Sequence, residues 1–363
     1  MRAALIAIAS LGLLACRGHR APPAKPPPDA GVGSGTGTGS SARLGPITSV
    51  IDPGVLPPRP RTPMPRRLHD ELLAPGRGAK HPLRYRREPS TRTLIATARI
   101  TSHGYAGAWS DPVTLAPVRE GFDVAIGADG ALHVRGLAAE IDRTGQADAA
   151  VAAADTYLAR WRALLERRRA TLTVDDRGLL GDVTLLADPG GVADVEARDE
   201  LVQRWLGLAV PLPDAAVGVG ARWQVVTMLR TGGAVLTQTA TYQLVKVERD
   251  RWTIAVELTR LGKTQTIVAP GLPPGTTAEL IALVRKVSGT VTVSPTSPLP
   301  LTGELAAEVR SHARFTAVDT GPRDQYSEDK ATITLASPSP PASPAPAPTA
   351  PTPAPAAPPT PAP

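Results

Sequence analysis

Cysteine and histidine are the residues whose spacing most often predicts chemistry, and this chain of 363 residues holds few of them. The only cysteine is Cys16, and the six histidines are His19, His69, His81, His103, His133 and His312. The sequence has no H-E-x-x-H zinc motif and no G-K-S/T phosphate loop, and it lacks a G-x-S-x-G nucleophile elbow. We therefore expect no cofactor, no metal and no enzyme activity. Paired carboxylates that meet only in the fold are the remaining catalytic alternative.

Cys16 follows a short apolar segment at the start of the chain. Met1 and Arg2 give a positively charged start, and residues 3–14 form an apolar run of 12 residues. A helix that spans a bilayer needs about 20 apolar residues, whereas a shorter run suits a cleaved secretory signal. The segment Leu13-Leu14-Ala15-Cys16 resembles the lipobox of bacterial lipoproteins.

The lipobox resemblance implies that the chain is cut before Cys16 and that this cysteine is acylated on its thiol and its new amino group. Two or three acyl chains anchor a protein stably, whereas one is marginal. Arg17 follows and no aspartate does, which in enterobacterial lipoproteins implies the outer membrane, on its periplasmic or surface face. The alternative is an ordinary secretory signal with a chance cysteine. We expect a lipid-anchored protein of the bacterial cell envelope.

The positive charge is concentrated in the first quarter of the chain. Residues 1–92 hold 15 Lys and Arg against 5 Asp and Glu, whereas the rest holds 25 against 28. A basic segment beside a lipid anchor is attracted to anionic head groups. The candidate contacts are Arg66, Arg67, Arg84, Arg86 and Arg87. A solvated arginine-rich segment is the alternative, and nucleic acid is not expected because the segment lacks interleaved aromatic residues for stacking.

Composition divides the chain into four parts. Residues 1–15 are the predicted signal peptide, and residues 16–79 form a linker rich in Pro, Gly, Ser and basic residues. Residues 80–336 carry the apolar periodicity of a folded domain. The tail, residues 337–363, includes 13 prolines. Both proline-rich ends are expected to be disordered or polyproline-like, because neither has the apolar pattern of a core.

Two stretches of the domain have helical periodicity. Residues 147–168 place apolar side chains on one stripe, which fits a core helix that covers one face of a sheet or, alternatively, a lid or partner-binding helix. Residues 194–208 repeat the pattern, with Asp194 as a candidate cap and prolines at 211 and 213 after its end.

Alternation of period two predicts about ten strands around these helices. Residues 83–87 and 93–101 are expected to pair. Hairpins are expected from residues 122–126 with 131–137 and from 171–174 with 179–186. The clearest pattern, residues 221–261, predicts a meander of three long strands. Further strands are expected at residues 280–287, 289–293, 304–318 and 331–335. The fold class is therefore α+β, a curved antiparallel sheet with two main helices packed on one face.

A second resemblance concerns the domain. The phrase LPDAAVGVGARW at residues 212–223 resembles the entry into a strand meander in lipoproteins of the DUF6263 type. The phrase GTVTV at residues 289–293, followed by Pro298-Leu299-Pro300, fits the same pattern. The resemblance spans about residues 205–320 and implies a fold rather than an activity.

Two functional hypotheses follow. In the first, a non-enzymatic envelope lipoprotein binds a partner or an apolar ligand through its sheet domain. This hypothesis requires an apolar cavity of about 300 Å3 or more between sheet and helices. In the second, the proline-rich tail contacts an envelope protein or the cell wall, because 27 residues in polyproline form reach about 80 Å. A purely solubilising tail is the alternative to that role.

Overall fold

The computed structural model describes residues 65–337, except residues 87, 106–107, 128–130, 138, 166–168, 186–191, 232, 268–275 and 318–320. Within that part, two helices accompany one antiparallel sheet of 15 strands and a separate two-stranded sheet. The predicted large antiparallel sheet with two helices is therefore present. The expected number of about ten strands was too low, because several short strands pair at the margins of the sheet.

The order of the strands in the large sheet differs from their order in the chain. The path runs through β1 (Arg66–Ala74), β11 (Arg222–Thr231), β12 (Ala234–Glu248), β13 (Arg251–Gly262), β15 (Thr277–Ser294), β16 (Ser297–Ala317), β17 (Gly321–Ala336), β3 (Ser90–Tyr105), β5 (Val118–Ile126), β6 (Leu132–Gly136), β8 (Arg169–Val174) and β9 (Leu180–Leu185). Off this path, β4 (Val113–Thr114) pairs with β3, β7 (Glu140–Ile141) with β5, and β14 (Gln265–Ile267) with β15. The two-stranded sheet pairs β2 (Arg77–His81) with β10 (Val217–Val219).

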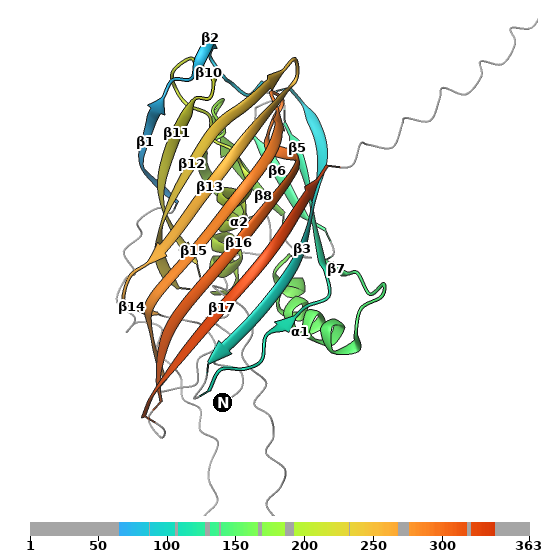
Figure 1. The fold of residues 1–363 in the computed structure, drawn as a ribbon, viewed down its shortest axis with the longest axis vertical. Helices are drawn as coiled ribbons and strands as arrows, with labels where there is room; N and C mark the ends of the chain where they lie inside the picture. Colours follow the sequence, from blue (N-terminus) through green and yellow to red (C-terminus); the bar gives the residue numbers. More distant parts are fainter. Residues whose placement is uncertain are drawn as a thin grey trace, which may run out of the picture.

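The sheet curls around the second helix, α2 (Val192–Leu208), as Figure 1 shows. Strands β12, β13, β15, β16 and β17 lie on one side of α2, and β5, β6 and β8 lie on the other. One hydrophobic core fills the space between them, with Trp205 from α2 packed among residues of both sides. Because the sheet surrounds it, α2 buries more than one face, and Val202 and Trp205 are 2 % and 4 % exposed.

The first helix, α1 (Asp148–Leu165), packs on other strands. Ala154 and Leu158 are fully buried in a smaller core cluster with Ile100 of β3 and Val118 of β5, and α1 contacts β4 and β7. Both helices were predicted within a few residues of their ends. Asp194 is not a cap, because α2 begins at Val192.

The N-terminal boundary of the domain was predicted too late. Residues 66–74 form β1, which pairs with β11 along its length, and residues 77–81 form β2. The prediction failed because Arg66, Arg67 and their neighbours are largely exposed on an edge strand, where charged residues are common.

Of the strand predicted at residues 83–87, residue 87 lies outside the described residues and residues 83–86 are not in a strand. The Tyr85 N–H donates instead to the Asp176 carbonyl at 2.7 Å. Leu83 and Tyr85 are nevertheless buried in the main core. The two-residue alternation therefore indicated burial correctly here, whereas the backbone hydrogen bonds are made with a turn and not with a neighbouring strand. Strand β3, which does form, pairs with β17 and β5 instead.

The two predicted runs at residues 280–287 and 289–293 form one long strand, β15, that continues through Gly289. Gly289 has a φ of 155°, and a side chain there would meet the Glu304 carbonyl oxygen at 2.0 Å. Glycine is required at this position because only its missing Cβ allows β16 to approach so closely. Among the described residues, neither helix is long and apolar enough to cross a membrane.

Candidate functional site

A cavity of about 200 Å3 lies between the inner face of the sheet and α2. Its floor is built largely from small or aliphatic side chains of the central strands, among them Ala96 and Ala98 of β3, Ala307 of β16 and Ala331 of β17. Alanine at these inward positions leaves the space empty, since larger aliphatic residues there would fill it to normal packing density. Tyr157 of α1 also lines the cavity.

One side of this cavity is charged, and the register of the sheet explains why. Polar residues on successive strands are direct partners or lie one strand apart, so they form a line across the inner face that we call the polar row. Its members are Thr227, Gln238, Arg260, Arg285, Asp329 and Ser102. All but Arg285 are at most 5 % exposed. The polar row therefore crosses the interior of the domain.

Arg260 and Gln238 hold the C-terminal part of α2 against the sheet. The Arg260 guanidinium donates from Nη2 to the Gln203 carbonyl at 2.7 Å and from Nε to Gln238 Oε1 at 2.6 Å. Gln238 Nε2 in turn donates to the Leu206 carbonyl at 3.0 Å. Carbonyls near a helix C-terminus lack partners and carry partial negative charge. A positively charged side chain from the sheet therefore suits this end of α2, which has no basic residue in its own last turn.

Two of the acidic residues beside the cavity, Glu120 and Glu200, are bound to a third arginine. Arg204 of α2 pairs with Glu120 of β5 and donates from Nε to Glu200 Oε1 at 2.9 Å. Burial alone would lower the pKa of Arg204, but Glu120 and Glu200 outweigh it, so the pKa is raised. All three side chains are at most 15 % exposed. This cluster joins α2 to the β5 side of the sheet as a compact ion-pair network.

Arg260 and Arg285 are left incompletely bonded beside the cavity. Arg260 Nη1 and Arg285 Nε are buried without a hydrogen-bond partner among the described residues. Burial lowers the pKa of Arg260, and the neighbouring Arg285 lowers it further. Burial also lowers the pKa of Arg285. Two cationic groups therefore line the cavity with donors that the described residues do not use.

A second cavity, of about 510 Å3, lies on the other side of α2. It occupies the gap between the two edges of the large sheet, where β1, β11 and β12 face the β8–β9 hairpin. Trp205 and Leu206 of α2 form part of its wall. Gln238 lines this cavity and is hydrogen-bonded to Arg260, which lines the first one. The helix and the polar row thus separate the two spaces.

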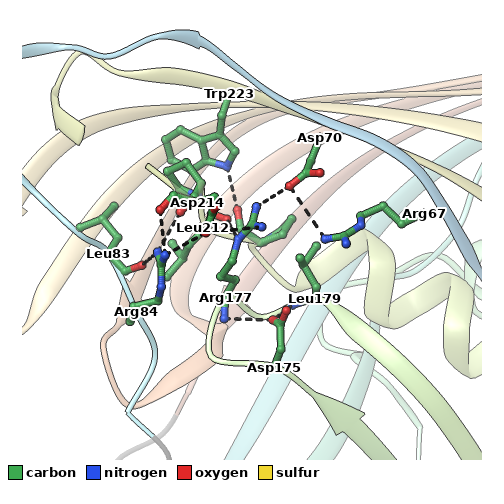
Figure 2. Close-up of polar contacts among 12 residues, drawn as sticks. Arg67, Asp70, Leu83, Arg84, Asp175, Arg177, Leu179, Leu212, Asp214 and Trp223 are labelled. Carbon is green, nitrogen blue, oxygen red and sulfur yellow. Dashed lines mark hydrogen bonds and ion pairs between the residues drawn. The ribbon is translucent and has the colours of Figure 1, made fainter. Parts of the chain in front are cut away.

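An arginine network joins the two edges of the sheet beside this second cavity, as Figure 2 shows. Arg177, in the β8–β9 turn, donates from Nη2 to Asp70 of β1 at 2.6 Å and from Nε to the Leu212 carbonyl at 3.0 Å. Its backbone is fixed too, because Asp175 accepts from its N–H at 3.0 Å and Leu212 donates to its carbonyl at 2.7 Å. Arg177 therefore closes the curved sheet at this end.

The site residues predicted from the sequence have three different outcomes. Cys16, Leu13, Leu14, Ala15 and Arg87 lie outside the described residues. Arg66 and Arg67 are exposed on β1, and Arg86 is exposed after β2.

Arg84 is engaged by the protein, because it donates to the Pro213 carbonyl at 2.9 Å and to Asp214 Oδ1 at 3.1 Å. Arg67 lies 3.8 Å from Asp70 in the network around Arg177, where Figure 2 shows both Arg67 and Arg84.

The residues of the polar row were missed, although the sequence holds a signal for them. Arg260 continues the inward phase of β13 after Ile254, Val256 and Leu258, and all three of those are buried. Asp329 likewise precedes Ala331, Ile333 and Leu335 in the inward phase of β17. A charged residue in the apolar phase of a strand predicts a buried polar site, and this criterion would have found both residues.

No protein-family model matches this chain, and no curated protein matches its sequence. In the part of the chain that the structure describes, no group of three or more His, Cys, Asp or Glu side chains lies close enough to hold a metal ion. The cavities and the charges that line them are therefore the candidate functional features of this domain.

Proposed function

We propose that the domain is a non-enzymatic binding module that takes up a small apolar or amphipathic ligand between its sheet and α2. The observation that supports this proposal is the cavity of about 200 Å3 on the inner face, which is floored by alanines and bordered by side chains of the main core such as Phe122 and Leu305. Ligand pockets usually measure 300–1,000 Å3. The first cavity is smaller than the volume of about 300 Å3 expected from the sequence and therefore suits only a short chain. The second cavity, at about 510 Å3, exceeds that size but is separated from the first by α2 and the polar row.

The proposal includes a cover made by both helices. α2 lies over the cavity through Gln203, Gly207 and Leu208, and α1 adds Tyr157. A ligand in this position would be shielded from water on the sheet side by β strands and on the other side by helix. Such shielding is typical of sites that bury most of a ligand.

A neutral fluorescent probe, N-phenylnaphthylamine, tests the proposed function. The full chain with Cys16→Ser is the appropriate sample, because an attached acyl chain would compete for the cavity. We expect saturable fluorescence enhancement. Ala307→Leu, which places a larger side chain in the cavity floor, should weaken binding at least tenfold, at a cost in stability of about 1–3 kcal/mol.

The matched control is Ala306→Leu on the same strand, since Ala306 is exposed and Ala307 is buried. This control should bind the probe like the parent protein. Equal binding by both variants would place the probe elsewhere and contradict the proposed site, and absence of saturable binding to the parent protein would contradict the proposed function.

We also propose that the domain is tethered to a bacterial envelope membrane through acylated Cys16. The supporting observation is the lipobox-like segment Leu13-Leu14-Ala15-Cys16 after a short apolar run. Mass spectrometry of the detergent-extracted protein should find a mature chain that begins at Cys16 and carries acyl chains. Cys16→Ser should release the protein from the membrane fraction, and an unchanged membrane fraction would contradict the tether.

A further inference from the structure

We propose that the ligand in the first cavity carries a carboxylate group, and that Arg260 and Arg285 bind it. This inference rests on the proposed function and names the chemical class of the ligand. The cavity then holds an amphipathic monoanion, with its apolar chain over the alanine floor and its head group at the polar row.

Each of the two guanidinium groups has a buried donor without a hydrogen-bond partner among the described residues. Arg260 is 1 % exposed and lines the cavity, and its Nη1 has no hydrogen-bond partner in the described part of the chain. Arg285 lines the same cavity with its Nε equally unpartnered. An unsatisfied buried donor destabilises the fold, and a charged one does so more strongly. A bound acceptor would remove this cost at both groups.

The second argument is the position of the two residues relative to one another. Arg260 and Arg285 are direct partners in the β13–β15 ladder. Side chains at such positions lie about 5 Å apart at Cβ, and like charges there are destabilising. Neither arginine forms an ion pair within 4.0 Å with a described carboxylate. An anion between the two guanidinium groups converts their repulsion into two charge-assisted interactions.

The third argument concerns which carboxylates are already bound to the protein. Glu120 and Glu200 both pair with Arg204, and Glu200 also accepts from Gln203 Nε2 at 3.5 Å. Asp329 is also buried and lines the same cavity, but in the ladder Val309 of β16 lies between it and Arg285. Glu200 still raises the pKa of Arg260 and Arg285 electrostatically. This partial compensation favours a single negative charge, a carboxylate, over a doubly charged phosphate.

The test compares three probes that share one chain and differ in the head group: octanoate, octanol and octylammonium. Each is titrated by calorimetry into the full chain with Cys16→Ser. We expect octanoate to bind at least about tenfold more tightly than octanol, because charged hydrogen bonds are worth about 1.5–3 kcal/mol each. Octylammonium should bind more weakly than octanol.

Arg285→Met tests the residues. Methionine keeps much of the apolar length of the side chain, and apolar replacement of a buried charge is often neutral for stability. This variant should lose the preference for octanoate over octanol while it still binds octanol. Lys286→Met is the matched control, since Lys286 is exposed on the opposite face of the same strand. The control should keep the preference.

The outcomes separate the two proposals. If octanoate and octanol bind equally to the parent protein, the carboxylate inference is wrong and the proposed function stands. If none of the three probes binds and N-phenylnaphthylamine does not bind either, the proposed function itself is wrong. If Arg285→Met keeps the preference, the head group lies elsewhere. Arg285→Gln, which retains polar character, provides the same comparison should the methionine variant fail to fold.

Discussion

Two buried arginine networks of this domain differ in how fully their donors are used. Arg177, whose side chain is 13 % exposed, binds Asp70 and the Leu212 carbonyl and lies 4.0 Å from Asp214. Arg260 and Arg285, in contrast, leave donors without partners beside a cavity. The first network joins parts of the chain that are 107 residues apart. The second network, in contrast, borders the first cavity.

The difference separates a structural role from a binding role. A buried charge that holds two chain segments together should have all its partners within the protein, because each missing partner weakens the join. A buried charge with missing partners costs stability, and such positions are retained where a ligand completes them. Substitutions in the two networks should therefore affect stability and binding in opposite proportions.

The largest effect on stability is expected from Arg177→Ala. Its loss leaves Asp70 without its closest cation and the Leu212 carbonyl without its side-chain donor, and we expect the free energy of unfolding to fall by about 2–3 kcal/mol. Urea unfolding of the full chain measures this change. Arg143→Ala is the control, because its ion pair with Asp155 is exposed and should contribute about 0.5 kcal/mol or less. Both variants should keep the preference for octanoate over octanol.

Arg260→Met should have a smaller effect on stability and a larger one on binding. The variant removes the donors to the Gln203 carbonyl and Gln238, which costs about 1–2 kcal/mol, but it also removes the repulsion between Arg260 and Arg285. Urea unfolding and the octanoate titration together test this prediction. A loss of stability as large as that of Arg177→Ala, with the preference for octanoate intact, would make the two networks alike and contradict the distinction.

The smallest effect is expected from Asp70→Asn, and it depends on pH. The hydrogen bond from Arg177 lowers the pKa of Asp70. The ionised group therefore stabilises the fold above its unfolded pKa of about 4, and this contribution is lost as pH falls through the lower folded pKa.

The unfolding free energy of the parent protein should exceed that of Asp70→Asn by about 1 kcal/mol at pH 7. The difference should shrink toward pH 3, which urea unfolding at both pH values measures. A difference that does not change with pH would mean that the charge of Asp70 contributes nothing to the stability of its contact with Arg177.

Local patterns predicted the helices and strands of this fold better than they predicted which strands pair with one another. The β11–β12–β13 meander, both helices and two hairpins could be read from periodicity, because short turns join their parts. The pairing of β1 with β11 and of β3 with β17 could not, since more than 140 residues separate the first pair of strands and more than 200 the second. Periodicity reports which face is buried, and it carries no information on which strand lies alongside.

The candidate site was hidden for a related reason. Arg260, Arg285 and Glu200 come from two strands and a helix, and the apolar phase of β13 marks Arg260 as buried without indicating which residue lies beside it. Only the register that places Arg260 opposite Arg285 makes them a pair of like charges. The lipobox-like segment was visible because it is a contiguous motif, whereas a site assembled by strand pairing has no such local signature.

The position of β17 has a consequence for the order in which the domain folds. This strand ends at Ala336 and pairs with β16 on one side and β3 on the other, so the ladder from β1 to β16 and the ladder from β3 to β9 meet only through it. Pairings between distant segments are slow to form, because the loop between them must close first. The cavity is lined by β3 together with β13, β16 and β17. The binding site is therefore complete only when β17 has paired with both β16 and β3. Neither half of the sheet can form the site alone.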